Sequence, residues 1–100
     1  MLSHDVYFTL ANPSDEAIAA LVADCRHYLD GHDGVVFFAA GTLEPELARP
    51  VNDRAFHVAL HVVFDSRASH DRYQTDPRHL EFIARNKPTW AQVRVFDSDC

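Results

Sequence analysis

The amino-acid sequence predicts an α+β fold of the ferredoxin-like type, with the element order β-α-β-β-α-β. Two stretches, 13–30 and 66–87, carry apolar residues at the three-to-four spacing of an amphipathic helix. Four other stretches are short and mostly rich in Val and Phe, which favour strands, and two of these follow each other without an intervening helix. This order builds a four-stranded antiparallel sheet with two helices on one face.

The strand-like stretch Phe56–Asp65 is apolar on both faces, apart from two histidines. A strand with one solvated face would carry a polar residue at every second position. Because the helices cover only one face, we expect a second copy of the chain to cover the other, so that two sheets pair into a dimeric α+β barrel. Alternation places Val58, Leu60, Val62 and Phe64 toward the helices, and places His57, Ala59, His61 and Val63 at the dimer interface.

The N-terminal part of the chain predicts a strand and a helix. Leu2–Leu10 alternates, with His4, Val6 and Phe8 on one face. Asn12 or Ser14 caps the helix, Pro13 lies in its first turn, and Gly31 ends it. The core-facing stripe of this helix is Ile18, Leu21, Val22, Cys25 and Leu29.

A second strand and a long loop follow. Val35–Ala40 is a continuous apolar run that is short for a helix, and it predicts a strand buried on both faces. Residues 42–54 are polar, acidic and contain two prolines. A connection of this length more often contacts a partner or covers a cavity than serves as a spacer.

The C-terminal part predicts an interrupted helix and a last strand. Ser66 caps the helix, and Pro77 interrupts it because proline lacks an N–H and disfavours helical geometry at Asp76. Asp76 caps a new helical segment, which Pro88 ends. Trp90–Asp97 predicts the fourth strand, with Ala91, Val93 and Val95 on one face.

Length and composition narrow the possible classes of protein. One hundred residues suit a single domain, 1–100. The net charge of −6 and the scattered basic residues argue against binding to nucleic acid or anionic membranes. The N-terminus lacks the pattern of a signal peptide, no apolar run is long enough to span a membrane, and the two cysteines form no disulfide framework. A cytoplasmic protein is therefore expected.

Several segments spread over nearly the whole chain match a known family. They are His4 ahead of Val6–Phe8, the turn Gly34–Val36, and the runs Ala59–Phe64, Tyr73–Phe82 and Trp90–Asp97. With these segments the chain resembles the stress-responsive A/B barrel domain proteins. The resemblance implies a dimeric α+β barrel with its helices outside, and it implies no single activity.

One branch of that family, the plant polyketide cyclases of the olivetolic acid type, closes a linear chain without a cofactor. Similarity to this branch implies an acid–base pair at Tyr73 and His79, with His4 in the pocket. At the position of a further pocket histidine of the branch, this chain has Val58. His57, one residue away, points to the opposite face of the strand and is a poor substitute. The expected ligand pocket lies between sheet and helices and is lined by Val6, Phe8, Val58, Leu60, Phe82 and Trp90.

The residues themselves leave two interpretations of this pair open. On an uninterrupted helix Tyr73 and His79 would lie about 120° apart, and the break at Pro77 could bring them together as phenol and general base. Alternatively, Tyr73 packs in the core and His79 forms a local hydrogen bond. His57 and His61 lie roughly 13 Å apart along a strand, too far for one metal ion to take both from one chain. A symmetric dimer could bring two copies of one histidine together, but polar interface residues are the favoured interpretation, and no metal is expected. No cofactor is expected either.

These observations lead to three hypotheses of function. The first is a homodimeric protein that binds a small apolar or aromatic molecule, with no established reaction. The second is a cofactor-independent cyclase, lyase or isomerase that uses Tyr73, His79 and His4. The third, a monooxygenase related to other dimeric α+β barrels, is disfavoured because its residue pattern is not found.

Overall fold

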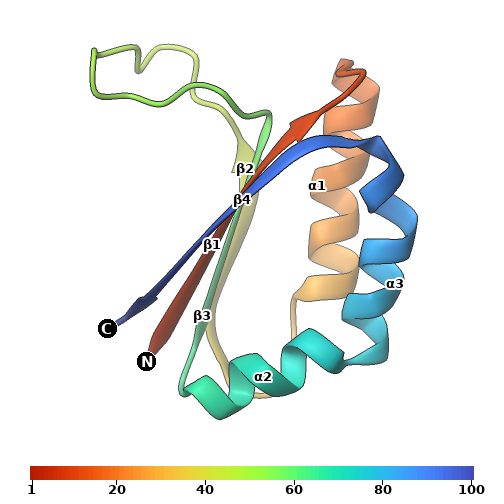
Figure 1. Cartoon of the computed structure of the whole chain (residues 1–100), viewed down its shortest axis with the longest axis vertical. Helices are drawn as coiled ribbons and strands as arrows, with labels where there is room; N and C mark the ends of the chain where they lie inside the picture. Colours follow the sequence, from red (N-terminus) through yellow and green to blue (C-terminus); the bar gives the residue numbers. More distant parts are fainter.

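A computed structural model describes all residues from 1 to 100. The sheet consists of β1 (Leu2–Leu10), β2 (Val35–Thr42), β3 (Val58–Phe64) and β4 (Trp90–Asp99). All neighbouring strands are antiparallel, and their order across the sheet is β2-β3-β1-β4. The helices α1 (Asp15–Leu29), α2 (Arg67–Thr75) and α3 (Pro77–Asn86) lie on one side of the sheet (Figure 1). The predicted α+β, ferredoxin-like fold is confirmed.

The hydrophobic core lies between the sheet and the helices. Every second residue of β3 is at most 2% exposed, from Val58 to Phe64. The α1 stripe meets them with Leu21, Val22, Cys25 and Leu29. Burial of such side chains stabilises the fold by about 25 cal/mol for each Å² of apolar surface removed from water.

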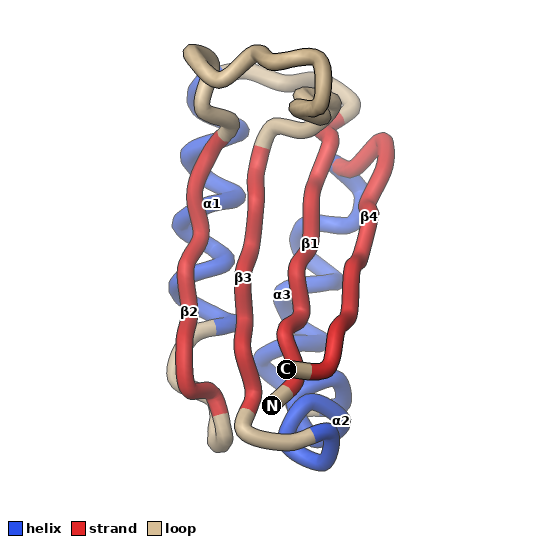
Figure 2. The backbone as a smooth tube through the Cα atoms, turned by 90° about the vertical axis from the view of Figure 1, so that its left-hand side faces the viewer, coloured by secondary structure: helices blue, strands red, loops and turns tan.

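The opposite face of the sheet, which we call the open face, has no helix over it (Figure 2). Phe37 and Phe96 lie on this face and are 56% and 54% exposed. The prediction that β2 is buried on both faces is therefore wrong for the single chain. Residues 43–57 contain no helix or strand and extend toward the open face at one end of the sheet (Figures 1 and 2).

Polar side chains cap the three α-helices where local sequence predicted such caps. Ser14 accepts a hydrogen bond from the backbone of Ala17, and Ser66 accepts one from Ser69. Asp76 accepts one from Arg78, and α3 begins at the next residue, Pro77. Pro13 precedes the cap of α1 rather than lying in its first turn, so that expectation was wrong. The helix α3 ends at Asn86, and Pro88 lies in a 3₁₀ turn, Lys87–Thr89.

The register of β4 differs from simple alternation. Trp90 pairs with Leu10 and Gln92 with Thr9, so that Ala91 is an extra residue in a bulge. The bulge places Trp90 on the same face as Val93, against the rings of Phe8 and Phe82. The expectation that Ala91 continues the face of Val93 is therefore wrong. β4 also continues two residues past Asp97, to Asp99.

Candidate functional site

Three histidine side chains surround the phenol ring of Tyr73, where α2, α3 and the start of β1 meet. We call His4, His32, His79 and Tyr73 the imidazole cluster. The ring centroid of Tyr73 lies 4.6 Å from that of His79, 5.0 Å from that of His32 and 6.1 Å from that of His4. Tyr73 and His4 are both buried.

The break between α2 and α3 brings Tyr73 and His79 together. The helix α2 ends at Thr75, Asp76 has extended backbone angles, and the chain starts a new helix at Pro77. Because of this change of direction, two residues that a continuous helix would separate come into ring contact. The structure thus assembles the three residues that the sequence proposed for catalysis: Tyr73, His79 and His4.

His4 forms a hydrogen-bonded pair with Asp97 across neighbouring strands. The two residues are register partners in β1 and β4, and His4 Nδ1 lies 2.5 Å from Asp97 Oδ1. An ionised carboxylate only accepts hydrogen bonds, so Nδ1 carries the proton and Nε2 keeps its lone pair. Sequence reasoning missed Asp97, although its alternation with Val93 and Val95 places it on the helix-facing side.

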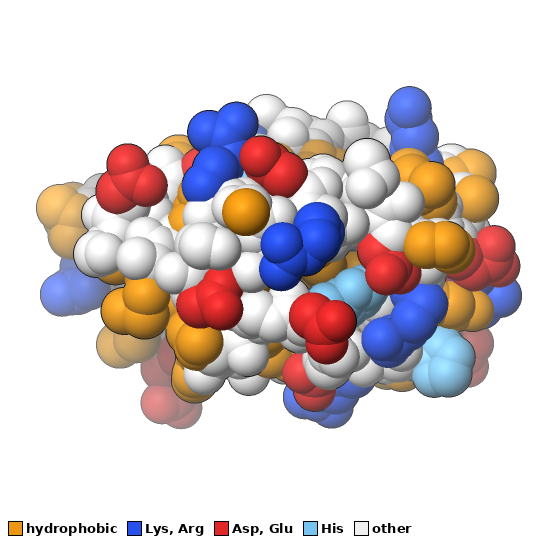
Figure 3. All heavy atoms as spheres, turned by 90° about the horizontal axis from the view of Figure 1, so that it is seen from below, with side chains coloured by type: hydrophobic (Ala, Val, Ile, Leu, Met, Phe, Trp, Pro, Cys, Tyr) orange, Lys and Arg blue, Asp and Glu red, His pale blue; other side chains and the backbone are white.

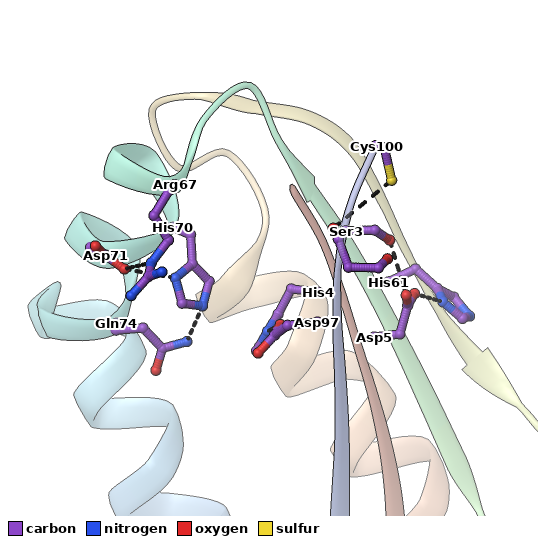
Figure 4. Close-up of polar contacts among 11 residues, drawn as sticks. Ser3, His4, Asp5, His61, Arg67, His70, Asp71, Gln74, Asp97 and Cys100 are labelled. Carbon is purple, nitrogen blue, oxygen red and sulfur yellow. Dashed lines mark hydrogen bonds and ion pairs between the residues drawn. The ribbon is translucent and has the colours of Figure 1, made fainter. Parts of the chain in front are cut away.

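His32 and His70 add further imidazoles next to this pair. His32 Nε2 donates to the carbonyl oxygen of Tyr28 over 2.7 Å. The ring centroid of His70 lies 5.2 Å from that of His4, on the side away from the sheet (Figure 4). Neither residue was expected at the site, because nothing in the local sequence indicates which histidines meet after folding.

Burial sets the protonation states of Tyr73 and His79. Burial raises the pKa of the Tyr73 phenol above its ordinary value, and the neighbouring Cys25 adds to the effect. Burial, together with nearby His4, lowers the pKa of His79 below that of a free histidine. At neutral pH the cluster therefore presents a protonated phenol beside an uncharged imidazole, a suitable combination of proton donor and acceptor.

One polar atom of the cluster has no hydrogen-bond partner. His79 Nδ1 is buried without a well-formed hydrogen bond, which is unusual for a buried polar group. The backbone of Gln74 lies close enough to the side chain to work against the lowering of the His79 pKa. A small cavity of about 250 Å³ adjoins the cluster and contacts Tyr73 and His32. Its remaining lining residues are Gly31, Asp33, Arg72, Asp76 and Arg78. The cavity is polar and smaller than the roughly 300–1,000 Å³ typical of drug-sized ligands.

The residues predicted to line an apolar ligand pocket pack against one another in the core. Phe8 and Phe82 are 2% exposed, and Trp90 stacks on both, with ring centroids 5.0 and 6.0 Å away. Val6, Val58 and Leu60 are buried in the same cluster. Trp90 Nε1 is buried without a hydrogen-bond partner.

The thiol of Cys25 is buried in the core. Burial raises its pKa to about 12, so Cys25 is a core residue rather than a nucleophile.

The predicted interface residues lie on or beside the open face. Ala59, His61 and Val63 are half-buried there, and His61 Nδ1 lies 2.7 Å from Asp5 Oδ1 (Figure 4). His57 lies just before β3, and its Nδ1 accepts a hydrogen bond from the backbone N–H of Leu10. That bond holds the His57 ring at the end of β1.

The loop 43–57 forms a second cavity with the open face. The cavity has a volume of about 530 Å³, and Arg94 and Asp53 form an ion pair of 2.6 Å at its wall. Its apolar lining residues are Tyr7, Leu43, Leu47, Val51, Phe56 and Phe96.

No helix of the structure has the length and apolar character needed to cross a bilayer.

Solved structures with the same fold come from several organisms. A dabb family protein with a ferredoxin-like fold from Mesorhizobium loti is 23% identical, with a TM-score of 0.81 over 99% of this chain and 95% of that one. A dimeric ferredoxin-like protein of unknown function from Thermobifida fusca is 16% identical, with a TM-score of 0.82 over 99% and 90%. A hydroxynitrile lyase from Passiflora edulis is 23% identical, with a TM-score of 0.76 over 97% and 90%.

At these identities the similarity to solved structures establishes the fold alone. A comparison with curated proteins found no match. The family model described as Stress Responsive A/B Barrel Domain matches residues 2–100, which is nearly the entire chain. The Mesorhizobium loti protein, described as a dabb family protein with a ferredoxin-like fold, shares the fold of this chain. The chain belongs to the stress responsive A/B barrel domain family.

Proposed function

We propose that the protein is a homodimer that binds a small polar molecule at the imidazole cluster, without a cofactor. The observation that carries the proposal is the buried, unpartnered Nδ1 of His79 beside the protonated phenol of Tyr73. A ligand in the adjoining cavity would contact Tyr73 and His32 directly, and a rotation of the His79 ring toward it would give Nδ1 a hydrogen-bond partner. The expected apolar lining is packed core, so the ligand must instead fit the smaller, polar cavity beside the cluster.

The second candidate function is proton transfer on the bound molecule, as in a cofactor-independent lyase, isomerase or cyclase. The pairing of His4 with Asp97 favours it, because the carboxylate orients the ring and leaves Nε2 free to accept a proton. A carboxylate that holds an imidazole in one tautomer is a recurring arrangement in acid–base catalysis. The Passiflora edulis relative, named a hydroxynitrile lyase, supports a first choice of substrate.

Cleavage of a cyanohydrin tests both candidates with one reagent. In this reaction the base removes the hydroxyl proton, the C–C bond breaks, and an aldehyde and cyanide are released. With mandelonitrile as the probe, we expect benzaldehyde release above the buffer rate, and a loss of about 10²-fold or more in Tyr73→Phe and His79→Gln. His27→Gln, an exposed histidine on α1, is the matched control and should retain the wild-type rate.

Binding is measured separately from turnover. Addition of mandelonitrile or benzaldehyde should shift the imidazole NMR signals of His79 and His32 and leave that of His27 unchanged. Equal shifts in all histidines, or none at the cluster, would contradict the binding site. NMR shifts at the cluster without cleavage of mandelonitrile would support binding as the function and would exclude the lyase activity.

A homodimer through the open face is supported by the exposed Phe37 and Phe96 and by the several relatives described as dimeric. Pairing of two open faces would also close the 530 Å³ cavity under the loop 43–57. A cytoplasmic location and the lack of nucleic-acid or membrane partners stay predictions from the sequence.

A further inference from the structure

We propose that His4, His70 and Asp97 form a binding site for a divalent transition-metal ion, with Zn²⁺ as the expected ion. The three side chains come from β1, α2 and β4 and meet at the end of the molecule that carries α2 and both chain termini (Figure 1). One ligand atom from each residue lies within 4.8 Å of the other two. Figure 4 shows His70 on the opposite side of the site from His4, with the Asp97 carboxylate next to the His4 ring.

Side-chain movements of up to about 1.5 Å would bring the three ligand atoms, now within 4.8 Å of one another, to the separations that an ion requires. Zn²⁺ bonds of about 2 Å in a tetrahedron place two ligand atoms about 3.3 Å apart. His4 Nδ1 and Asp97 Oδ1 lie 2.5 Å apart and share a hydrogen bond. The ion would displace the shared proton, and the distance between these two atoms would increase by less than 1 Å. Asp97 has room for this movement because its side chain is 44% exposed.

His70 is already oriented as a metal ligand by its neighbours. Its Nδ1 lies 3.0 Å from Asp71 Oδ1, and the same oxygen accepts a hydrogen bond from Arg67 Nε over 2.9 Å. The carboxylate accepts the Nδ1 proton, so the lone pair of His70 lies on Nε2. A carboxylate behind a histidine is the common support of a metal-binding imidazole, and its loss typically weakens metal binding 10- to 100-fold.

The ligand set selects the class of ion. Two imidazole nitrogens and one carboxylate oxygen suit Zn²⁺, Co²⁺, Ni²⁺ or Cu²⁺, whereas Mg²⁺ and Ca²⁺ prefer oxygen alone. Three protein ligands leave a fourth position for water, as in an open zinc site. Imidazole atoms reach the surface at this end of the molecule, between acidic and basic side chains (Figure 3). The side chains of His70 and Asp97 are 14% and 44% exposed, which leaves a path for an ion.

One neighbour competes with the ion. The side-chain amide of Gln74 lies 3.3 Å from His70 Nε2 and donates a hydrogen bond to the lone pair that the metal needs. Removal of this donor should therefore strengthen metal binding. This contact gives a signature that unspecific binding to surface histidines would not produce, because Gln74 itself is no ligand.

The test uses the full chain after treatment with a chelator. Titration with Zn²⁺ alone in a calorimeter should give one ion per chain, and Co²⁺ should give the visible absorption of a four- or five-coordinate ion. We expect His70→Gln to weaken Zn²⁺ binding at least 100-fold, Asp71→Asn 10- to 100-fold, and Gln74→Ala to tighten it. The control His27→Gln should bind like the wild type.

Unchanged binding in His70→Gln, or a Co²⁺ spectrum like that of the hydrated ion, would overturn the proposal. Asp97→Asn provides a second variant at an exposed position if His70→Gln does not fold. His4 is shared with the proposed acid–base site, so the two proposals are separated by Tyr73→Phe. That variant should lose mandelonitrile cleavage and keep Zn²⁺ binding, because Tyr73 supplies no ligand to the ion.

Discussion

At the scale of single residues, Gly34 is the position where both the backbone conformation and the lack of space require a glycine. Its φ of +85° lies in the left-handed region, and a Cβ there would meet Ser69 Oγ at 2.2 Å. Ser69 is buried and donates to Asp65 over 2.6 Å, and Asp65 in turn accepts from Ser66. Gly34 therefore lets the start of β2 approach the first turn of α2, next to the imidazole cluster.

Replacement of Gly34 by alanine should destabilise the protein by more than the ~1–2 kcal/mol expected from the left-handed backbone alone. The reason is the added collision with Ser69. For a chain of this length, each kcal/mol lowers the melting temperature by about 4–8 °C, measured by thermal unfolding at fixed protein concentration. Gly31→Ala isolates the backbone cost, since Gly31 has a φ of +80° and open space around it.

Gly41→Ala completes the comparison, because Gly41 has neither a positive φ nor a neighbour within 4 Å. It should be close to neutral. Equal melting temperatures for Gly34→Ala and Gly31→Ala would show that Ser69 moves away at no cost.

At the scale of elements, the separation of α2 from α3 is the feature that creates the site. Asp76 accepts a hydrogen bond from the backbone N–H of Arg78 over 2.8 Å and fixes where α3 begins. Removal of a capping acceptor generally costs about 1 kcal/mol. Asp76→Ala should therefore lower the unfolding free energy by about this amount, and denaturant unfolding measures it. Asp76→Asn keeps an acceptor oxygen and should lose much less, whereas an equal loss in both would assign the effect to charge rather than to capping.

The elements that the sequence predicted are those whose signals are local. Ser66 and Asp76 are capping residues followed by helical stretches, and the β3 alternation needs only seven residues to be recognised. The bulge at Ala91 and the pairing of His4 with Asp97 depend on the register between β1 and β4, at the two ends of the chain. No short pattern encodes such a register. The packing of Phe8 against Trp90 likewise depends on volumes that meet only in the folded core.

In the predicted site, too, some residues are indicated by local sequence and others only by contacts between distant elements. Tyr73 and His79 come together because of a proline break that the sequence displays directly. The contributions of His32, His70 and Asp97 arise from tertiary contacts between distant elements. For this reason the sequence, together with the family resemblance, indicated Tyr73 and His79 and missed both the carboxylate beside His4 and the imidazole of His70, which belong to the proposed metal site.

At the scale of the whole molecule, a sheet with helices on one side leaves apolar side chains in water unless a second layer covers them. Phe37 and Phe96 stand on the open face with more than half of their surface exposed. Phe56 and Phe96 pack beside Tyr7 and extend this aromatic surface toward the loop 43–57. Burial of such surface drives association, at about 25 cal/mol for each Å² removed from water.

A charge placed on the open face should therefore separate the dimer without unfolding the chain. We expect the wild type to scatter light as a particle of about twice the 11.3 kDa chain mass, and Phe37→Glu to scatter as a single chain. Leu80→Glu is the matched control, because Leu80 is an apolar residue of α3 with 54% exposure, close to the 56% of Phe37, and lies in the helix layer. If Leu80→Glu separates the dimer and Phe37→Glu does not, the two chains associate through their helices, and the open face stays in contact with solvent.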